Sequence, residues 1–249
     1  MTIDYTLITG AASGIGQKTA IQLSNDRKLL LCDKNSDGLK STIAQCSNQS
    51  AHILWEYDLC NVISIRAELE KIILGRQICI EAFVHSAGMM KVMRMKDADY
   101  QNALQIFNVN FFSAAEIISV LLKKNINKDC LKNIVFISAI LSKFGAKGHN
   151  LYSSTKAALD GLMRSLSVEL APKIRVNSIL PGGVRTPMSE HALKDPAIIE
   201  RLNQDYPLGI GEPSDIANLV EFLLSDKSRW ITGQQIIIDG GRTANISQK

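Results

Sequence analysis

The sequence predicts an α/β fold: a doubly wound, mostly parallel sheet of seven strands with helices on both faces. Three observations predict it. Short apolar runs alternate with longer amphipathic runs, turn or polar residues bound most of the short runs, and a glycine-rich turn directly follows the first one. No linker, repeat or low-complexity stretch divides the 249 residues, so we expect a single domain over residues 1–249.

The expected elements follow in chain order. Runs rich in β-branched or aliphatic residues predict strands at 5–9, 29–33, 53–58, 82–85, 134–138, 175–179 and 235–239. Apolar positions at helical spacing predict helices at 14–25, 62–74, 97–125, 152–170 and 214–225. The polar segment 186–207 holds Pro187, Pro196 and Pro207, and we expect it to form a mobile helical flap over a substrate site.

Composition and charge exclude several classes of protein. The net charge of +4 is spread along the chain without a basic stripe, so nucleic acid is not an expected partner. The five cysteines lie far apart without zinc-ligand spacing, which predicts free thiols, a cytoplasmic location and no metal site. The amino-terminal residues lack a basic signal-peptide region, and no uninterrupted apolar stretch approaches the ~18–20 residues of a bilayer span, so no membrane partner is expected.

The glycine-rich turn points to a dinucleotide. The first predicted strand runs into TGAASGIG, which begins at Thr9 and leads into a helix. Glycines there permit a tight turn and a close backbone approach to a pyrophosphate, which the amino end of the helix attracts. We expect five residues of this turn to bind the cofactor: Gly10, Ser13, Gly14, Ile15 and Gly16.

Two acids follow the next two strands. Asp33 ends the second predicted strand, where a carboxylate accepts hydrogen bonds from the adenosine ribose and repels a 2′-phosphate, so NAD is expected. Lys34 can neutralise such a phosphate, which leaves NADP as the less favoured cofactor. Asp58, followed by Leu59, ends the third strand and either caps the next helix or accepts a hydrogen bond from the adenine amino group.

Further motifs make nearly the whole chain resemble the short-chain dehydrogenases/reductases. They are HSAG from His85, FNVN ending at Asn110, YSSTK from Tyr152, PGGVRT from Pro181, ITGQ from Ile231 and DGG from Asp239. The resemblance implies a single-domain Rossmann fold, an NAD(P)-dependent oxidoreductase, and a homotetramer or homodimer. It also implies that the cofactor contacts Ala87, Gly88, Pro181, Gly182, Val184 and Thr186.

The expected chemistry centres on Tyr152 and Lys156. Four residues apart on a helix, the two side chains share a face. A lysine ammonium and a positive nicotinamide ring favour the phenolate, which lowers the tyrosine pKa from about 10. Tyr152 can then take a proton from a hydroxyl or give one to a carbonyl oxygen. The resemblance implies that Lys156 also binds the nicotinamide ribose and that Asn110 holds a water joining this lysine to solvent.

One position departs from the family pattern. The family places a serine 13 residues before the tyrosine, and this chain has Ala139 there, with Ser138 beside it as the candidate replacement. Three explanations stay open: a serine-to-alanine variant made to trap a complex, an enzyme that uses Ser138 or Ser142, or an impaired NAD-binding sensor or partner subunit. Losing one oxyanion donor costs about 10²–10³ in rate, so an enzyme can survive the change.

We therefore expect hydride transfer between NAD(H) and a secondary alcohol or ketone; an NADP-dependent biosynthetic reductase of acyl or sugar carbonyls is a further alternative. Basic residues around the expected substrate wall suggest a small, anionic substrate, although solvated surface charge explains them equally: Lys91, Arg94, Lys143, Lys147, His149 and His191. Methionines 89, 90, 93 and 95 either line an adaptable apolar pocket or fill the core. We expect His85 to be a hydrogen-bonded side chain near the cofactor rather than a general base.

Overall fold

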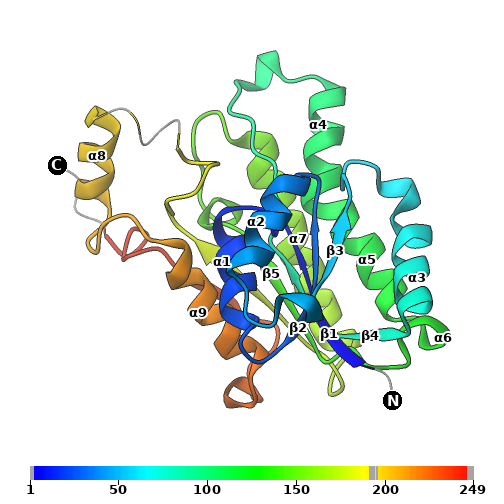
Figure 1. Ribbon diagram of the computed structural model, residues 1–249. Coiled ribbons are helices and arrows are strands. Elements are labelled where there is room, and N and C mark those ends of the chain that lie inside the picture. Colours follow the sequence, from blue (N-terminus) through cyan, green and yellow to red (C-terminus); the bar gives the residue numbers. More distant parts are fainter. Residues whose placement is uncertain (1–2, 191–193, 195, 246–249) are drawn as a thin grey trace.

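Seven parallel strands form the centre of the fold in a computed structural model that describes residues 3–190, 194 and 196–245. Their order across the sheet is β3-β2-β1-β4-β5-β6-β7, with the crossover beside β1 that defines a doubly wound sheet (Figure 1). The strands are β1 (Ile3–Thr9), β2 (Lys28–Asp33), β3 (Ile53–Glu56), β4 (Ile78–His85), β5 (Asn133–Ile137), β6 (Arg175–Pro181) and β7 (Gln235–Ile238). The predicted fold class is confirmed, and the described sheet is parallel throughout.

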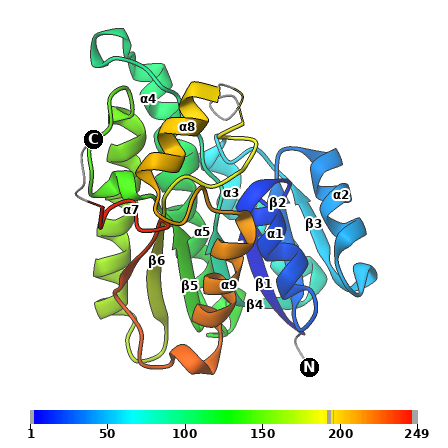
Figure 2. The same cartoon turned by 90° about the vertical axis from the view of Figure 1, so that its left-hand side faces the viewer.

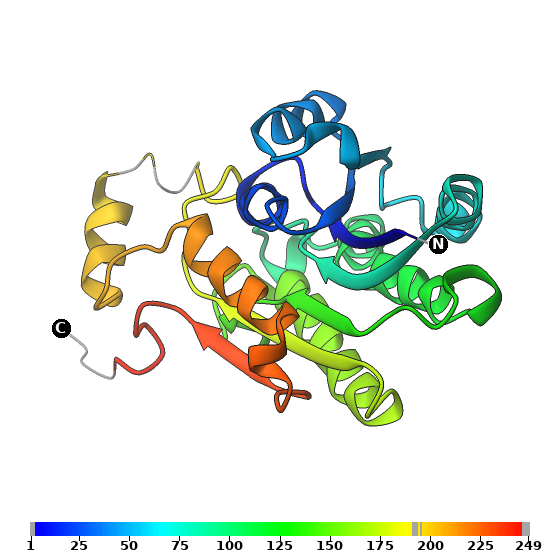
Figure 3. The ribbon, with the colours of Figure 1, turned by 60° about the horizontal axis from the view of Figure 1, so that its bottom comes forward.

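Helices cover both faces of the sheet (Figures 2 and 3). One layer consists of α1 (Gly14–Leu23), α2 (Ser36–Gln45) and α9 (Pro213–Leu224). The other layer contains α3 (Ile65–Arg76), α5 (Ser113–Leu121) and α7 (Asn150–Glu169). Successive strand side chains point to opposite faces, so Leu7 joins the core beneath α3, α5 and α7, whereas Ile8 joins the core beneath α1, α2 and α9.

The helix predicted at 97–125 is broken into several pieces. A short turn at Met95–Asp97 precedes α4 (Tyr100–Phe107), a π-helical turn spans Asn108–Phe112, and α5 is followed by α6 (Lys124–Asn127). Helix α4, the π turn and α5 follow one another without a gap, and together they form a helical run, Tyr100–Leu121, that is long and apolar enough to cross a bilayer by length and composition. In this fold, however, α5 buries its apolar face against the sheet and α3.

Helix α2 is absent from the sequence-based prediction. It buries only Leu39 and Thr42 and carries Gly38 in its first turn, so its apolar periodicity is weak. A local contact starts it instead, because the Asn35 side-chain oxygen accepts a hydrogen bond from the Gly38 N–H at 3.0 Å. A capping hydrogen bond leaves no periodic pattern of apolar residues, so a search for helical spacing does not detect this helix.

The segment predicted to be a flap contains α8 (Pro196–Asp205), which stands apart from the sheet at the left of Figure 1. The same segment begins near the end of β6 and returns to the sheet before α9. The mobility expected for this segment stays a prediction.

Candidate active site

A cavity of about 700 Å³ opens at the carboxyl ends of the strands. This is the edge at which parallel α/β sheets bind ligands, beside the crossover in strand order. Every residue predicted to bind the cofactor borders this one cavity: Gly10, Ser13, Gly14, Ile15, Gly16, Asp33, Asp58, Leu59, Ala87, Gly88, Tyr152, Lys156, Pro181, Gly182, Val184 and Thr186.

The glycine turn has room for backbone only. Gly10 and Gly14 have φ of 69° and 54°, a conformation that favours glycine. A Cβ on Gly10 would lie 2.7 Å from the Cα of Ala87, and one on Gly16 would lie 2.1 Å from the carbonyl oxygen of Gly10. Because α1 begins at Gly14, its free N–H groups face the cavity, so this cradle fits a pyrophosphate.

Replacing Gly16 by alanine is expected to destabilise the protein by roughly 1–3 kcal/mol and to weaken dinucleotide binding, because the added methyl collides with backbone that cannot rotate away. Denaturant unfolding and a fluorescence titration with NADH measure the two effects. Gly75→Ala in α3 is the matched control, because a Cβ there meets nothing within 4 Å. Equal stability of the two variants would contradict this account of the turn.

Asp33 is held beside the glycine turn. Its carboxylate accepts hydrogen bonds from the N–H groups of Ala12, at 3.2 Å, and Asn35, at 3.0 Å. These bonds orient the carboxylate at the end of β2, and the neighbouring Lys34 also borders the cavity. The Asp33 carboxylate, which favours NAD, and the Lys34 ammonium, which favours NADP, therefore lie at the same end of the cavity.

Asp58 lies in the loop after β3, because the strand ends at Glu56 and not at position 58 as predicted. Its carboxylate accepts a hydrogen bond from the Cys60 N–H at 3.0 Å, an Asx turn that leads into the 3₁₀ turn Val62–Ser64. Asp58 therefore does not cap the following helix, since the N-cap residues there are Asn61 and Ser64, and the adenine contact stays a prediction.

Tyr152 and Lys156 project from one face of α7 and are both buried. The Lys156 ammonium lies 5.7 Å from the centroid of the Tyr152 ring and donates a hydrogen bond to the Ile137 carbonyl oxygen at 2.7 Å. Burial lowers the pKa of Lys156 to about 8, an effect that the Asp160 carboxylate opposes. The ammonium therefore predominates at neutral pH.

The lowering of the Tyr152 pKa expected beside a bound nicotinamide ring stays a prediction. Burial raises the pKa of Tyr152 to about 12. Loss of hydration is the cause of this shift, and the Lys156 ammonium is drawn toward the backbone of β5. Without cofactor, the phenol therefore keeps its proton at neutral pH, as a proton donor must.

Asn110 lies in the π-helical turn and is fully buried. Its side-chain oxygen accepts from the Met89 N–H at 2.7 Å, and its amide donates to the Met89 carbonyl at 3.0 Å and to the Thr155 hydroxyl at 2.9 Å. These bonds satisfy a polar group that would otherwise be costly to bury. Asn110 thereby joins the loop after β4 to the catalytic helix α7, and the water implied by the resemblance stays a prediction.

The serine candidates differ in position. Ser138 and Ala139 both border the cavity at the end of β5. The Ser138 hydroxyl donates to the Lys156 carbonyl oxygen at 3.3 Å, toward the backbone of α7. Ser142 is not among the described residues that border the cavity. Ser138 therefore stays the candidate donor, but its proton is already engaged.

His85 joins the ends of two neighbouring strands. Its Nδ1 lies 2.9 Å from the Thr9 hydroxyl, opposite it in the β1–β4 register. Burial and the charge of Lys156 lower the pKa of His85 to about 3, so the ring is neutral. It is a buried, hydrogen-bonded side chain near the cavity, as expected.

The substrate end of the cavity is largely apolar: Met89, Met90, Ile140, Leu141, Pro187 and Met188 border it. Among the described lining residues, the cations are Lys156, which was predicted to bind the cofactor, and Lys34, beside Asp33. Of the basic residues proposed for the substrate wall, Lys91 binds Asn102 and Arg94 pairs with Asp97, while His191 lies outside the described residues. The described cavity therefore gives an anionic substrate no dedicated counter-charge.

Tyr206 is a cavity residue that sequence reasoning missed. It follows α8, and its hydroxyl accepts a hydrogen bond from the Gly183 N–H at 2.8 Å. The Arg242 guanidinium lies 6.0 Å from the centre of its ring. The available signal was that Tyr206 is the only Phe, Tyr or Trp in segment 186–207.

Comparison with known proteins agrees with this site. Residues 10–243 match the protein family described as enoyl-(acyl carrier protein) reductase. The chain is 30% identical over 244 residues to 3-oxoacyl-(acyl-carrier-protein) reductase of Thermotoga maritima, covering 94% of this chain and 96% of that protein. It is also 30% identical over 243 residues to carbonyl reductase (NADPH) 2 of Sus scrofa, covering 96% of each.

A solved structure extends the likeness to three dimensions. The structure of 4-hydroxyisoleucine dehydrogenase complexed with NADH superposes with a TM-score of 0.90 at 25% identity, covering 97% of this chain and 99% of that one. The sheet order, the tyrosine–lysine pair and relatives that match almost end to end lead to one conclusion. The chain belongs to the short-chain dehydrogenase/reductase family of oxidoreductases.

Proposed function

We propose that the protein transfers hydride between NAD(H) and a secondary alcohol or ketone, with Tyr152 as the general acid/base. The observation that carries this proposal is one cavity bordered by the glycine turn, Asp33, Tyr152 and Lys156. The relatives named above are dehydrogenases and reductases, which favours an enzyme over a sensor without turnover.

Each side chain has a defined task in this proposal. A bound nicotinamide dinucleotide would supply or accept the hydride. In the direction of reduction, the Tyr152 phenol gives its proton to the carbonyl oxygen; in oxidation, it takes one from the hydroxyl. Lys156 has three N–H donors and uses one on Ile137, which leaves two for a ribose and for proton exchange. Asn110 positions the loop at Gly88 and Met89 beside this lysine.

The substrate we propose is apolar around its reacting carbon. Met89, Met90 and Met188 supply flexible side chains that adapt to different shapes. The assay is NADH oxidation with a panel of small linear and cyclic ketones, and NAD reduction with the matching alcohols. Cofactor binding without turnover on the whole panel would favour a binding-only role.

Asp33→Ala is expected to shift the preference for NADH over NADPH by about 10–100-fold toward NADPH, because it removes charged hydrogen bonds to the ribose and the repulsion of a 2′-phosphate. Dissociation constants for both cofactors, measured by fluorescence titration, give the ratio. Asp37→Ala is the matched control, since that carboxylate is exposed on α2.

The competing cofactor assignment has support of its own. Lys34 borders the cavity beside Asp33, and one relative is named as an NADPH enzyme. A wild-type preference for NADPH that Asp33→Ala leaves unchanged would contradict the proposal and favour an NADP-dependent reductase of acyl or sugar carbonyls. Self-association, a cytoplasmic location and the lack of nucleic-acid or membrane partners stay predictions.

A further inference from the structure

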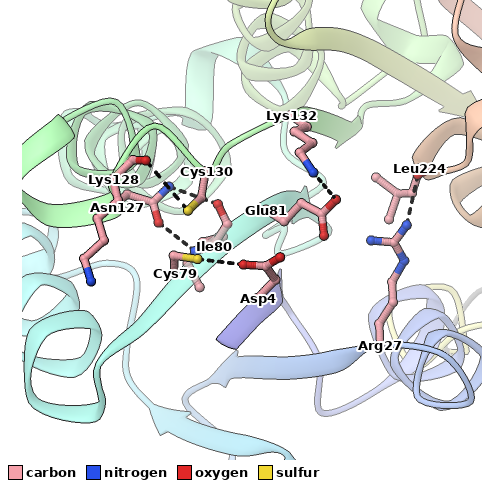
Figure 4. Close-up of polar contacts among 10 residues, drawn as sticks. All are labelled: Asp4, Arg27, Cys79, Ile80, Glu81, Asn127, Lys128, Cys130, Lys132 and Leu224. Carbon is pink, nitrogen blue, oxygen red and sulfur yellow. Dashed lines mark hydrogen bonds and ion pairs between the residues drawn. The ribbon is translucent and has the colours of Figure 1, made fainter. Parts of the chain in front are cut away.

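Three side chains with metal-binding atoms meet at the amino-terminal edge of the sheet (Figure 4). The catalytic cavity lies at the opposite edge, at the carboxyl ends of the strands. They are Asp4 on β1, Cys79 on β4 and Cys130 in the loop before β5. A carboxylate oxygen and the two sulfurs all lie within 4.8 Å of one another, and the Cys79 thiol donates to the Asp4 carboxylate at 2.8 Å.

Strand register explains why the three residues coincide. Asp4 is the direct partner of Cys79 in the β1–β4 pairing. Cys79 and Cys130 each precede the paired residues Ala82 and Asn133 by three positions, so the β4–β5 register, extended back, places them abreast. Neighbouring residues in register point to the same face of a sheet, about 4.8 Å apart. The cluster thus joins two paired strand residues, Asp4 and Cys79, to a cysteine in the loop that leads into β5.

The loop that carries Cys130 is anchored independently. The Asn127 side chain, fully buried, exchanges hydrogen bonds with the N–H and carbonyl of Ile80 at 2.6 and 2.9 Å. The Lys132 N–H donates to the Glu81 carbonyl oxygen at 2.8 Å. Cys130 lies between these two attachments to β4, so its sulfur is held near Cys79 without help from a ligand.

We propose that Asp4, Cys79 and Cys130 form a binding site for a thiophilic divalent cation such as Zn²⁺. Zinc binds sulfur at about 2.3 Å and carboxylate oxygen at about 2.0–2.2 Å, so ligand atoms around one tetrahedral ion lie roughly 3.6–3.8 Å apart. Side-chain rotations on binding would draw the three atoms together from their present separations of up to 4.8 Å. Asp4 is exposed, which gives the ion an entry path and leaves a fourth position for water.

Charge and ligand chemistry favour a metal over a disulfide. A carboxylate has no part in a disulfide, whereas here it is in direct contact with one thiol. Two thiolates, one carboxylate and a divalent ion carry a net charge of −1, and the Lys132 ammonium, paired with Glu81 at 3.1 Å, also interacts with Asp4 and Cys130. The ion would join β1, β4 and the loop before β5, far from the reacting groups.

The spacing of the cysteines along the chain carried no such signal. Asp4, Cys79 and Cys130 are far apart in sequence, and the expectation from spacing was that no metal binds. The pairing of β1 with β4 and the attachments of the loop before β5 to β4 bring the three residues together. The inference is independent of the proposed oxidoreductase activity.

The test uses the full-length protein, reduced and freed of metal by chelation, and titrated with Cd²⁺ and Zn²⁺. We expect one equivalent of Cd²⁺ to produce thiolate charge-transfer absorption that Zn²⁺ suppresses. At a hundredfold excess over Kd, Zn²⁺ should raise Tm by about 5–10 °C. Asp4→Asn and Cys130→Ser should weaken binding by at least about 10–100-fold, whereas the control Cys46→Ser should bind like the wild type.

Cys130→Ser is the key variant, because Cys130 is half-buried. Cys79 is fully buried, so a variant at that position risks misfolding. No saturable signal from the reduced wild type, or unchanged Cd²⁺ affinity in Cys130→Ser and Asp4→Asn, would overturn the site. The site would also be overturned if the protein formed a Cys79–Cys130 disulfide and its reduced form did not bind Cd²⁺. NADH turnover, measured on the same samples, is a separate readout, so failure of one proposal does not imply failure of the other.

Discussion

Tyr152→Phe is expected to lower turnover by about 10²–10⁴-fold while leaving the affinity for NADH within about threefold of the wild type. The substitution removes the proton that the reaction needs and little else, because the ring keeps its buried place on α7. Steady-state NADH oxidation with the ketone panel and a fluorescence titration with NADH separate the two effects.

The matched control for Tyr152→Phe is Tyr100→Phe, since Tyr100 is exposed at the start of α4. Its turnover should equal that of the wild type. If Tyr152→Phe also retained full turnover, the proton would have to come from another group. If it lost NADH affinity in parallel with turnover, Tyr152 would be a binding residue only.

Ala139→Ser is expected to raise turnover by about 10²–10³-fold, which is the usual value of one donor to a developing oxyanion. Ala139 borders the cavity at the end of β5, and its extended backbone (φ −164°, ψ 155°) accepts a serine without strain. The gain should be seen in kcat, measured with the best ketone of the panel.

Ser138→Ala tests the competing explanation of the missing serine. If Ser138 already supplies the donor, Ser138→Ala should lower turnover by about 10²–10³-fold and Ala139→Ser should add little. The Ser138 hydroxyl already donates to the Lys156 carbonyl oxygen. We therefore expect Ser138→Ala to have little effect on turnover and Ala139→Ser to raise it. If Ala139→Ser did not raise turnover and Ser138→Ala did not lower it, neither position could supply the hydrogen-bond donor to the substrate oxygen.

Much of the fold could be predicted because local patterns and tertiary structure agree. The strand carrying Tyr5–Thr9, the glycine turn and the helix from Gly14 each follow from nearby residues, and parallel strands bring their carboxyl ends to one edge. Asp33 and Tyr152 therefore border one cavity although they are distant in sequence. For the same reason, the motifs that carry the family resemblance proved sufficient to locate the cavity.

What could not be predicted depends on contacts between distant segments. The π-helical turn at Asn110 is stabilised by bonds to Met89 and Thr155, which leave no periodic trace in the sequence. In the ligand-free protein, burial raises the pKa of Tyr152, and the spacing of residues along the sequence does not reveal burial. Tyr206 reaches the cavity only because the segment after β6 folds back to Gly183.

The π-helical turn at Asn108–Phe112 also constrains how this chain can change in length. Such a turn holds one residue more than the α-helix around it, and each α-helical residue advances the chain by about 100°. Deleting one residue here would turn the segment into regular α-helix and leave Ile117 and Leu121 on the core face of α5, but it would move Asn110 away from Met89 and Thr155. The extra residue of this turn therefore serves the placement of Asn110 in the site and not the packing of α5 against the sheet.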